Sequence, residues 1–200
     1  MIRAVFFDVG ETLVNEGRWW AELGRAVGVE PHVVWAAVGT VVDRGERHSR
    51  VWDLLGVEPP GSETVGWEGA DLYEDAVPCL ERLRAAGYFV GLAGNIGREI
   101  EPFVDRFELE VDYATASHTL GVEKPALAFF ERLLEVADRP SEQVAYVGDR
   151  IDNDIIPALE TGIFAVHIRR GPWGFLQDGA DRAQARIASL DELPWAFERG

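Results

Sequence analysis

The 200-residue sequence has one cysteine, one lysine and no long apolar run. The lone Cys79 excludes an internal disulfide and favours a reducing compartment. The longest apolar runs have the length of strands, well short of the ~20 residues that cross a membrane. Met1 leads straight into such a run, without the charged region, long apolar segment and cleavage site of a secretion signal. We therefore expect a cytoplasmic protein that does not act in a membrane.

Basic residues are also scarce. Lys and Arg number 19 against 35 Asp and Glu, which gives a net charge of −16. This balance argues against nucleic acid and anionic membrane surfaces as partners, and an anionic substrate would need a local cation or a metal. Lys124 is the only lysine. An ammonium is a compact point charge whereas a guanidinium is a wide planar fork, so Lys124 is a candidate for a position that needs the small cation. The alternative is that its position is due to chance.

From residue 76 onward, helical and strand patterns alternate along the chain. Such alternation predicts an α/β fold, with a Rossmann-like parallel sheet, right-handed crossovers and helices on both faces. Together with the apolar run that follows Met1, the expected strands are Tyr88–Ala93, Asp112–Ser117, Gln143–Val147 and Ile163–Ile168. The expected helices are Pro78–Ala86, Glu99–Phe107, Ala126–Ala137, Asn153–Thr161 and a terminal one over Leu190–Phe197.

The segment 14–75 has a different texture and interrupts the α/β pattern after the first strand. It is predicted to hold three helices and a loop, over Arg18–Val27, Pro31–Arg44, His48–Leu55 and Pro59–Gly69. Five of the seven tryptophans lie in it, and their helical spacing favours the core of a small bundle over a binding surface. We therefore divide the chain into a core (1–13 and 76–200) and a small inserted α-helical cap (14–75).

Polar groups follow the predicted strands where each one ends. In a parallel sheet these ends meet at one edge, so Asp8, Gly94–Asn95, Lys124 and Asp149 should gather there. A carboxylate nucleophile, a lysine and further carboxylates suggest metal-assisted phosphoryl transfer: Asp8 would attack phosphorus. Mg²⁺ would be held by carboxylates such as Asp149 and Asp154, while Lys124 would contact phosphoryl oxygens and pair with Asp8. The bland alternatives are a surface carboxylate for Asp8 and a solvated loop cation for Lys124.

Four motifs, in order, resemble those of the haloacid dehalogenase (HAD) superfamily. They are FFDVGETL (6–13), GLAGN (91–95), GVEKP (121–125) and VGDRIDND (147–154). The insertion resembles the helical C1-type cap of subfamily I. The resemblance implies a Mg²⁺-dependent hydrolase, most often a phosphatase, acting on a small phosphorylated substrate. It implies catalytic roles for Asp8, Lys124 and Thr12, phosphate contacts from Gly94, Asn95 and Lys124, and metal ligation by Asp8, Asp149, Asp154 and the carbonyl of Gly10.

The sequence departs from the family pattern at two positions. Gly10 stands where the family has a second aspartate, which protonates the leaving group and then activates water. Losing a positioned acid typically costs about 10²–10⁴ in rate. Glu11 is one residue further on, but a shift of one residue redirects a side chain. Gly94 stands where the family usually has Ser or Thr, so only backbone N–H groups of Gly94 and Asn95 would contact phosphate there.

Three functions remain open. The first is a Mg²⁺-dependent phosphatase that works through an aspartyl-phosphate on Asp8. The second is a dehalogenase, in which Asp8 attacks carbon; the intact acidic motif counts against it, because such dehalogenases work without Mg²⁺. The third is a weakly catalytic protein that binds a phosphorylated ligand, suggested by Gly10. The cap cations Arg44, Arg47, His48 and Arg50 are candidates for contact with an anionic substrate, but a solvated helix end with acidic neighbours is favoured. Arg18 is a similar candidate. The oligomeric state is not readable.

Overall fold

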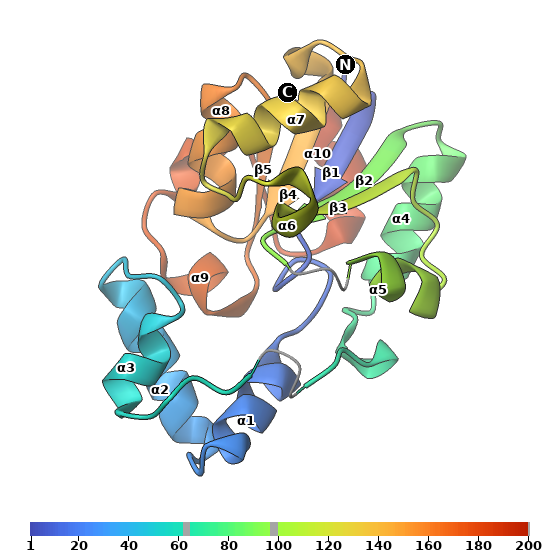
Figure 1. Cartoon of the computed structure of the whole chain (residues 1–200). Helices are drawn as coiled ribbons and strands as arrows, with labels where there is room; N and C mark the ends of the chain where they lie inside the picture. The colour runs from blue at the N-terminus through green and yellow to red at the C-terminus, as the bar shows by residue number, and fades with distance from the viewer. Residues whose placement is uncertain (62–64, 97–99, 200) are drawn as a thin grey trace.

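The computed structural model describes residues 1–61, 65–96 and 100–199. Within them, six strands form one sheet in the order β3-β2-β1-β4-β5-β6, and every neighbouring pair is parallel (Figure 1). The strands are β1 (Ala4–Phe7), β2 (Phe89–Gly94), β3 (Tyr113–Ala116), β4 (Val144–Gly148), β5 (Phe164–Ile168) and β6 (Ala185–Ile187). The predicted α/β fold with a parallel sheet is confirmed.

Helices flank this sheet and build the segment inserted after β1. They are α1 (Gly17–Ala26), α2 (Pro31–Asp43), α3 (Arg50–Leu55), α4 (Ala76–Ala85), α5 (Ile100–Arg106), α6 (Ser117–Leu120), α7 (Leu127–Ala137), α8 (Ile156–Glu160), α9 (Gly171–Leu176) and α10 (Leu193–Arg199). Short 3₁₀ turns cover Gly69–Asp71, Ser141–Gln143, Ala180–Arg182 and Leu190–Glu192, and a π-helical turn covers Ile151–Ile155.

The core has one apolar layer on each face of the sheet, because successive side chains of a strand point to opposite faces. On β1, Val5 and Phe7 pack in the layer formed with α4, α5 and α10, whereas Phe6 packs in the layer formed with α7 and α8. Gly91 on β2 lets the Phe6 ring lie flat beside it, since a Cβ at Gly91 would lie 2.4 Å from Phe6 Cδ1. All of β1 is fully buried, which places its carboxyl end at the centre of the sheet edge.

Helices α1–α3 lie beyond the carboxyl ends of the strands (Figure 1). They share a separate apolar cluster that contains Trp20, Val38 and Trp52, and Trp173 of α9 joins it. Trp19 stacks on Trp67 with ring centroids 5.8 Å apart. The prediction that the tryptophans form the core of a small bundle is confirmed for Trp20 and Trp52, whereas Trp67 packs against the apolar layer of the sheet.

Two local predictions differ from the structure, and two others lie partly outside the described residues. The sixth strand, β6, was not expected, because only three residues pair and exposed Arg186 stands in the middle of them. The helix predicted over Asn153–Thr161 is a wide π-helical turn followed by α8, since the turn directs Asp154 inward to Lys124. The predicted start of one helix at Glu99, and residues 62–64 of the predicted loop, lie outside the described residues.

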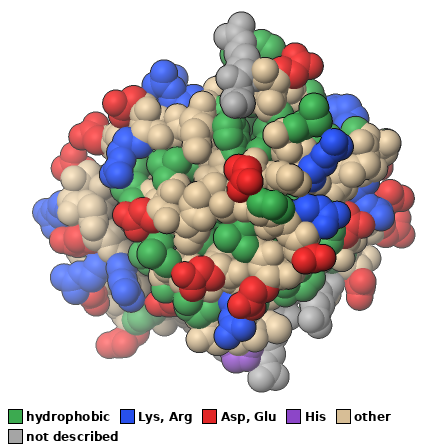
Figure 2. Space-filling model, turned by 90° about the horizontal axis from the view of Figure 1, so that it is seen from above, with side chains coloured by type: hydrophobic (Ala, Val, Ile, Leu, Met, Phe, Trp, Pro, Cys, Tyr) green, Lys and Arg blue, Asp and Glu red, His purple; other side chains and the backbone are tan. Residues whose placement is uncertain are grey.

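The surface carries both signs of charge. Figure 2 shows acidic and basic side chains interspersed over the face seen from above, the side where α7 lies in Figure 1. Among the described residues, no helix is both long enough and apolar enough to cross a membrane.

Candidate active site

The site begins where β1 and β4 end. Asp8 follows β1 and Asp149 follows β4, and these two strands are hydrogen-bonded neighbours in the sheet. Asp154 reaches the same place from the π-helical turn. Ligand oxygens of Asp8, Asp149 and Asp154 lie within 4.8 Å of one another, and all three residues are buried. The structure thus brings these carboxylates together at one edge of the sheet, as the sequence predicts.

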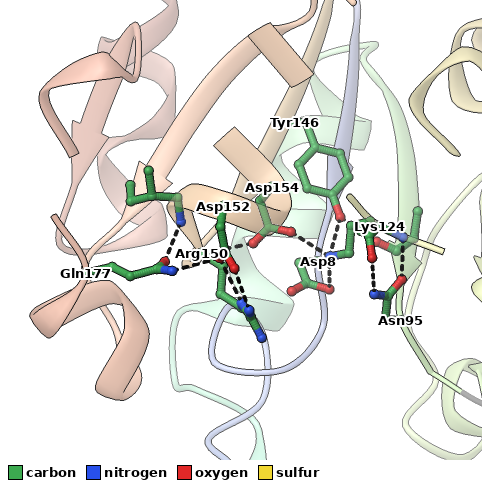
Figure 3. A network of polar contacts seen from close by, with 10 residues as sticks. Asp8, Asn95, Lys124, Tyr146, Arg150, Asp152, Asp154 and Gln177 are labelled. Atoms are coloured by element: carbon green, nitrogen blue, oxygen red, sulfur yellow. Dashed lines mark hydrogen bonds and ion pairs between the residues drawn. The ribbon is translucent and has the colours of Figure 1, made fainter. Parts of the chain in front are cut away.

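Lys124 lies against two of these three carboxylates and is 3% exposed. Its Nζ lies 2.9 Å from Asp8 Oδ1 and 2.6 Å from Asp154 Oδ1 (Figure 3). Burial alone would lower the pKa of Lys124, but the Asp154 and Asp8 carboxylates outweigh it and raise that pKa well above its ordinary value. Lys124 is therefore a fixed ammonium beside Asp8.

Tyr146 of β4 positions Lys124 and was missed in the sequence. Lys124 Nζ donates a hydrogen bond of 2.9 Å to the Tyr146 hydroxyl, which in turn donates one of 2.7 Å to the carbonyl of Ala93. The sequence did contain one indication of this role. A tyrosine in a central strand is buried, and a buried phenol needs a hydrogen-bond partner for its hydroxyl. The result is an ammonium whose direction is set by three oxygens.

Asn95 holds the loop that carries Lys124. Its side-chain amide donates to the Lys124 carbonyl at 2.9 Å and accepts from the Lys124 N–H at 2.8 Å (Figure 3). The backbone N–H of Arg150 donates to Asp154 Oδ2 at 3.0 Å. Sequence reasoning expected phosphate contacts from the backbone at Asn95 and did not anticipate this positioning role of its side chain.

The cluster suits a hard divalent cation. Three buried carboxylates face one ammonium, so the described site carries excess negative charge. Burial raises the pKa of Asp149 well above its ordinary value, and the charges of Asp154 and Asp8 add to the rise. The Asp149 carboxylate accepts no hydrogen bond from the described residues, so its oxygens are available as ligands. Oxygen donors of this kind are what Mg²⁺ prefers.

Other predicted residues of the first motif lie close by. Thr12 is fully buried; its hydroxyl has no hydrogen-bond partner among the described residues, and its carbonyl accepts from Arg170 at 2.7 Å. The catalytic role of Thr12 stays a prediction. At Gly94 a Cβ would lie 2.7 Å from Asp8 Oδ1, so a larger residue there would displace the Asp8 side chain from this position.

Glu11 is directed away from an acid's position. Its Oε2 accepts from the Tyr73 hydroxyl at 2.6 Å and its Oε1 from the N–H of Glu16 at 3.1 Å. Its backbone has a left-handed φ of 51°. Both oxygens are thus committed to holding the loop, in agreement with the expectation that a shift of one residue redirects the side chain.

Glu16, which sequence reasoning did not single out, lies against Gly10. A Cβ built at Gly10 would lie 2.4 Å from Glu16 Oε1. Burial raises the pKa of Glu16 to about 8, and the charges of Glu11 and Asp8 add to the rise. The sequence did not indicate that Glu16 lies near Gly10, because the two residues are six positions apart and only the folding of the loop brings them together.

Two of the candidate cations of the inserted segment, Arg50 and Arg18, pair with nearby acidic residues. Arg50 lies 2.5 Å from Asp53 and 3.7 Å from Glu46, with more than half of its side chain exposed. This agrees with a solvated helix end. Arg18, a candidate for substrate binding, instead lies 2.5 Å from Asp71 and donates to the carbonyl of Gly66 at 2.7 Å.

Fold and site together define an α/β protein with three carboxylates and a lysine gathered at one edge of a parallel sheet. Residues 2–162 match the family model of the haloacid dehalogenase-like hydrolases. Because that match covers about four fifths of the chain, the protein belongs to this family, as its motifs predict. The chain is also 30% identical over 203 residues to a glyceraldehyde 3-phosphate phosphatase of Methanopyrus kandleri, covering 86% of each chain.

Solved structures share the fold at lower identity. A HAD phosphatase from Thermococcus onnurineus is 21% identical with a TM-score of 0.69, over 98% of each chain. An L-2-haloacid dehalogenase from Xanthobacter autotrophicus is 18% identical with a TM-score of 0.71, over 99% of each chain. Since phosphatases and dehalogenases both match, these likenesses define the fold and leave the reaction to be argued from the site.

Proposed function

We propose that this hydrolase is a Mg²⁺-dependent phosphatase that acts on a small phosphorylated substrate through an aspartyl-phosphate on Asp8. The observation that carries the proposal is the buried contact of Asp8 with Lys124, beside Asp149 and Asp154. The activity named for the Methanopyrus kandleri relative supports it. A reducing, cytoplasmic location fits the single buried Cys79.

Asp8 acts as the nucleophile in this proposal. A carboxylate oxygen of Asp8 bonds to phosphorus while the bond from phosphorus to the leaving oxygen breaks. Bound Mg²⁺, with Asp8, Asp149, Asp154 and the Gly10 carbonyl as ligands, would offset the repulsion between Asp8 and the phosphoryl oxygens. Lys124 is already held 2.9 Å from Asp8, so its charge is in place without reorganisation.

The phosphoryl group would also need neutral donors. We assign these to the backbone N–H groups of Gly94 and Asn95, at the end of β2. Helices α1–α3 belong to the proposed cap (14–75) and lie over the edge where the substrate would enter (Figure 1). The proposed core is then 1–13 and 76–200. Because caps differ between members of a fold family, this segment is where we expect substrate choice to be made.

The test is hydrolysis of 4-nitrophenyl phosphate and glyceraldehyde 3-phosphate, with Mg²⁺ and with a chelator. Asp8→Asn should abolish phosphate release, because an amide is a poor nucleophile. Asp152→Asn is the matched control: Asp152 lies in the same acidic motif, but its carboxylate bonds Arg150 and Gln177 outside the cluster. Activity that survives in Asp8→Asn, or is unchanged by chelator, would contradict the proposal. Halide release from 2-haloacids instead of phosphate release would favour the dehalogenase.

A further inference from the structure

The space beside Gly10 is filled by the carboxyl group of Glu16. A Cβ at Gly10 would lie 2.4 Å from Glu16 Oε1 and 3.1 Å from Glu16 Cδ. Any side chain carried by residue 10 would therefore have to occupy the place that Glu16 occupies. The carboxyl group that this loop lacks at position 10 is supplied from the start of α1.

The loop between these residues is folded tightly enough to bring them together. The Glu11 N–H donates to the Val14 carbonyl at 2.7 Å, and the Val14 N–H donates to the Val9 carbonyl at 2.9 Å. Glu11 then receives the N–H of Glu16 at 3.1 Å. These bonds fix where the chain enters α1, and so they fix the origin of the Glu16 side chain.

Within the described part of the chain, one oxygen of the Glu16 carboxyl group is anchored by a hydrogen bond. Trp20 Nε1 donates to Glu16 Oε2 at 3.1 Å. Glu16 Oε1, the atom nearest the position of a Gly10 Cβ, accepts no hydrogen bond from the described residues. One oxygen is therefore held while the other is left for a ligand on the side of the nucleophile loop.

We propose that Glu16 is the general acid and base of this enzyme, acting in place of a side chain at residue 10. This assignment rests on the proposed phosphatase function. In the first step an Asp8 oxygen bonds to phosphorus, the bond to the leaving oxygen breaks, and that oxygen takes the proton of the Glu16 carboxyl group. In the second step water attacks phosphorus and gives a proton to the Glu16 carboxylate, while the Asp8–phosphorus bond breaks. Orthophosphate leaves, and both carboxyl groups return to their starting states.

The competing explanation is structural: Glu16 only fixes α1 through its bond to Trp20. The two explanations differ in how strongly the effect depends on the leaving group. An acid matters most for an alkoxide, which leaves poorly, and least for 4-nitrophenolate, which leaves well without a proton. A structural defect would slow both substrates by the same factor.

The experiment measures first-turnover release of the leaving group from 4-nitrophenyl phosphate and from glycerol phosphate, in the Mg²⁺-loaded full chain. Glu16→Gln keeps an acceptor for Trp20 and should slow glycerol release about 10²–10⁴-fold but nitrophenol release less than ~10-fold. Glu22→Gln is the matched control, because Glu22 lies on the helix that Glu16 precedes, its side chain is 43% exposed, and its ion pair among the described residues is with Arg25. It should match the wild type on both substrates.

A positional exchange gives the second arm. Gly10→Asp alone should slow both substrates, because the new side chain meets Glu16. The double variant Gly10→Asp/Glu16→Ala removes that conflict and should recover at least ~10-fold of the glycerol release that Glu16→Ala loses. Equal slowing of both substrates in Glu16→Gln, or no recovery in the double variant, would overturn the assignment. Asp8→Asn, run alongside, separates the two claims: activity in that variant would contradict the phosphatase proposal itself.

Discussion

Lys124 is a single side chain on which several parts of the protein converge. Its ammonium group contacts Asp8 after β1, Tyr146 on β4 and Asp154 in the π-helical turn. An arginine fork is wider and planar, and three oxygens packed around one nitrogen leave no room for it. The composition therefore has a physical explanation. The chain has arginine at its other Lys/Arg positions and lysine at the one that needs a compact point charge.

If Asp149 is a ligand of Mg²⁺, the stabilisation that Mg²⁺ gives the protein should depend on this residue. With chelator, Asp149→Asn should unfold at the same Tm as the wild type or higher, because one charge leaves a crowded acidic cluster. Mg²⁺ at about 100 times its Kd should add about 2.7 kcal/mol to the wild type. That gain corresponds to roughly 5–11 °C in Tm for a chain of this size, and the variant should lack it. Thermal unfolding followed by circular dichroism measures both effects.

The control for this prediction is Asp152→Asn. Asp152 is half-exposed and contributes no ligand atom to the cluster. Its variant should keep the full shift in Tm on adding Mg²⁺. A Mg²⁺-induced shift that persists in Asp149→Asn would count against this residue as a ligand.

At the residue scale, the sequence predicted the site residues that directly follow a strand. It did not predict the residues that reach the site through tertiary folding. Asp8 and Asp149 were predictable because strand ends of a parallel sheet share an edge. Tyr146 and Glu16 were not, since their roles depend on which atoms a rotamer and a folded loop bring within hydrogen-bond distance. The sequence showed that Gly10 lacks a carboxyl group, but only the structure shows Glu16 in that space.

At the scale of elements, Asp75 joins three of them at the start of α4. Asp75 Oδ2 accepts from Ser189 Oγ at 2.7 Å and from the Leu190 N–H at 2.9 Å, and it also pairs with Arg170 before α9. Burial alone would raise the pKa of Asp75, but the hydrogen bonds from Ser189 and Arg170 outweigh it and hold that pKa below its ordinary value. The ionised carboxylate therefore stabilises the fold.

Asp75→Asn should lower stability by about 3 kcal/mol at neutral pH, because it leaves Arg170 without its carboxylate partner. The Tm should fall by roughly 6–12 °C. A carboxyl group with a lowered folded pKa contributes above its ordinary pKa of about 3.9, and the contribution is lost as pH falls through the folded value. The difference in Tm between the wild type and Asp75→Asn should thus shrink below about pH 4.

Asp191→Asn is the comparison variant for Asp75→Asn. Its pair with Arg82 is exposed on both sides, and such pairs contribute at most about 1 kcal/mol. Thermal scans from pH 3 to 7 should show a small, nearly constant effect. If Asp75→Asn also showed a small change in Tm that did not depend on pH, the contact between Asp75 and Arg170 would not contribute to stability.

Element boundaries show where local pattern stops being enough. The helices and strands with clear periodicity, such as α7 and β4, formed close to where the sequence placed them. The turn at Ile151–Ile155 departs from a regular helix because Asp154 is drawn to Lys124, 30 residues away in the chain. A contact between distant segments overrides local preference here, and no pattern within the segment itself reveals it.

At the scale of the whole molecule, a net charge of −16 would repel the anionic substrate of the proposed reaction. The location of the individual charges resolves this conflict. Figure 2 shows both signs of charge mixed on the face away from the strand ends. At the opposite end, the buried lysine and a bound cation would reverse the field locally. In the proposed reaction, the sheet edge would carry the nucleophile Asp8, α1–α3 would cover it, and Glu16, just before α1, would supply the acid.

The most direct test of this account is to trap the phosphorylated enzyme. Wild-type protein mixed with Mg²⁺ and substrate, quenched in acid within the first turnover and digested with trypsin, should carry one phosphoryl group on the peptide Ala4–Arg18. Fragmentation should place it on Asp8, and Asp8→Asn should carry none. Phosphate release with an unmodified Ala4–Arg18 peptide, or with the phosphoryl group on another residue, would contradict the account.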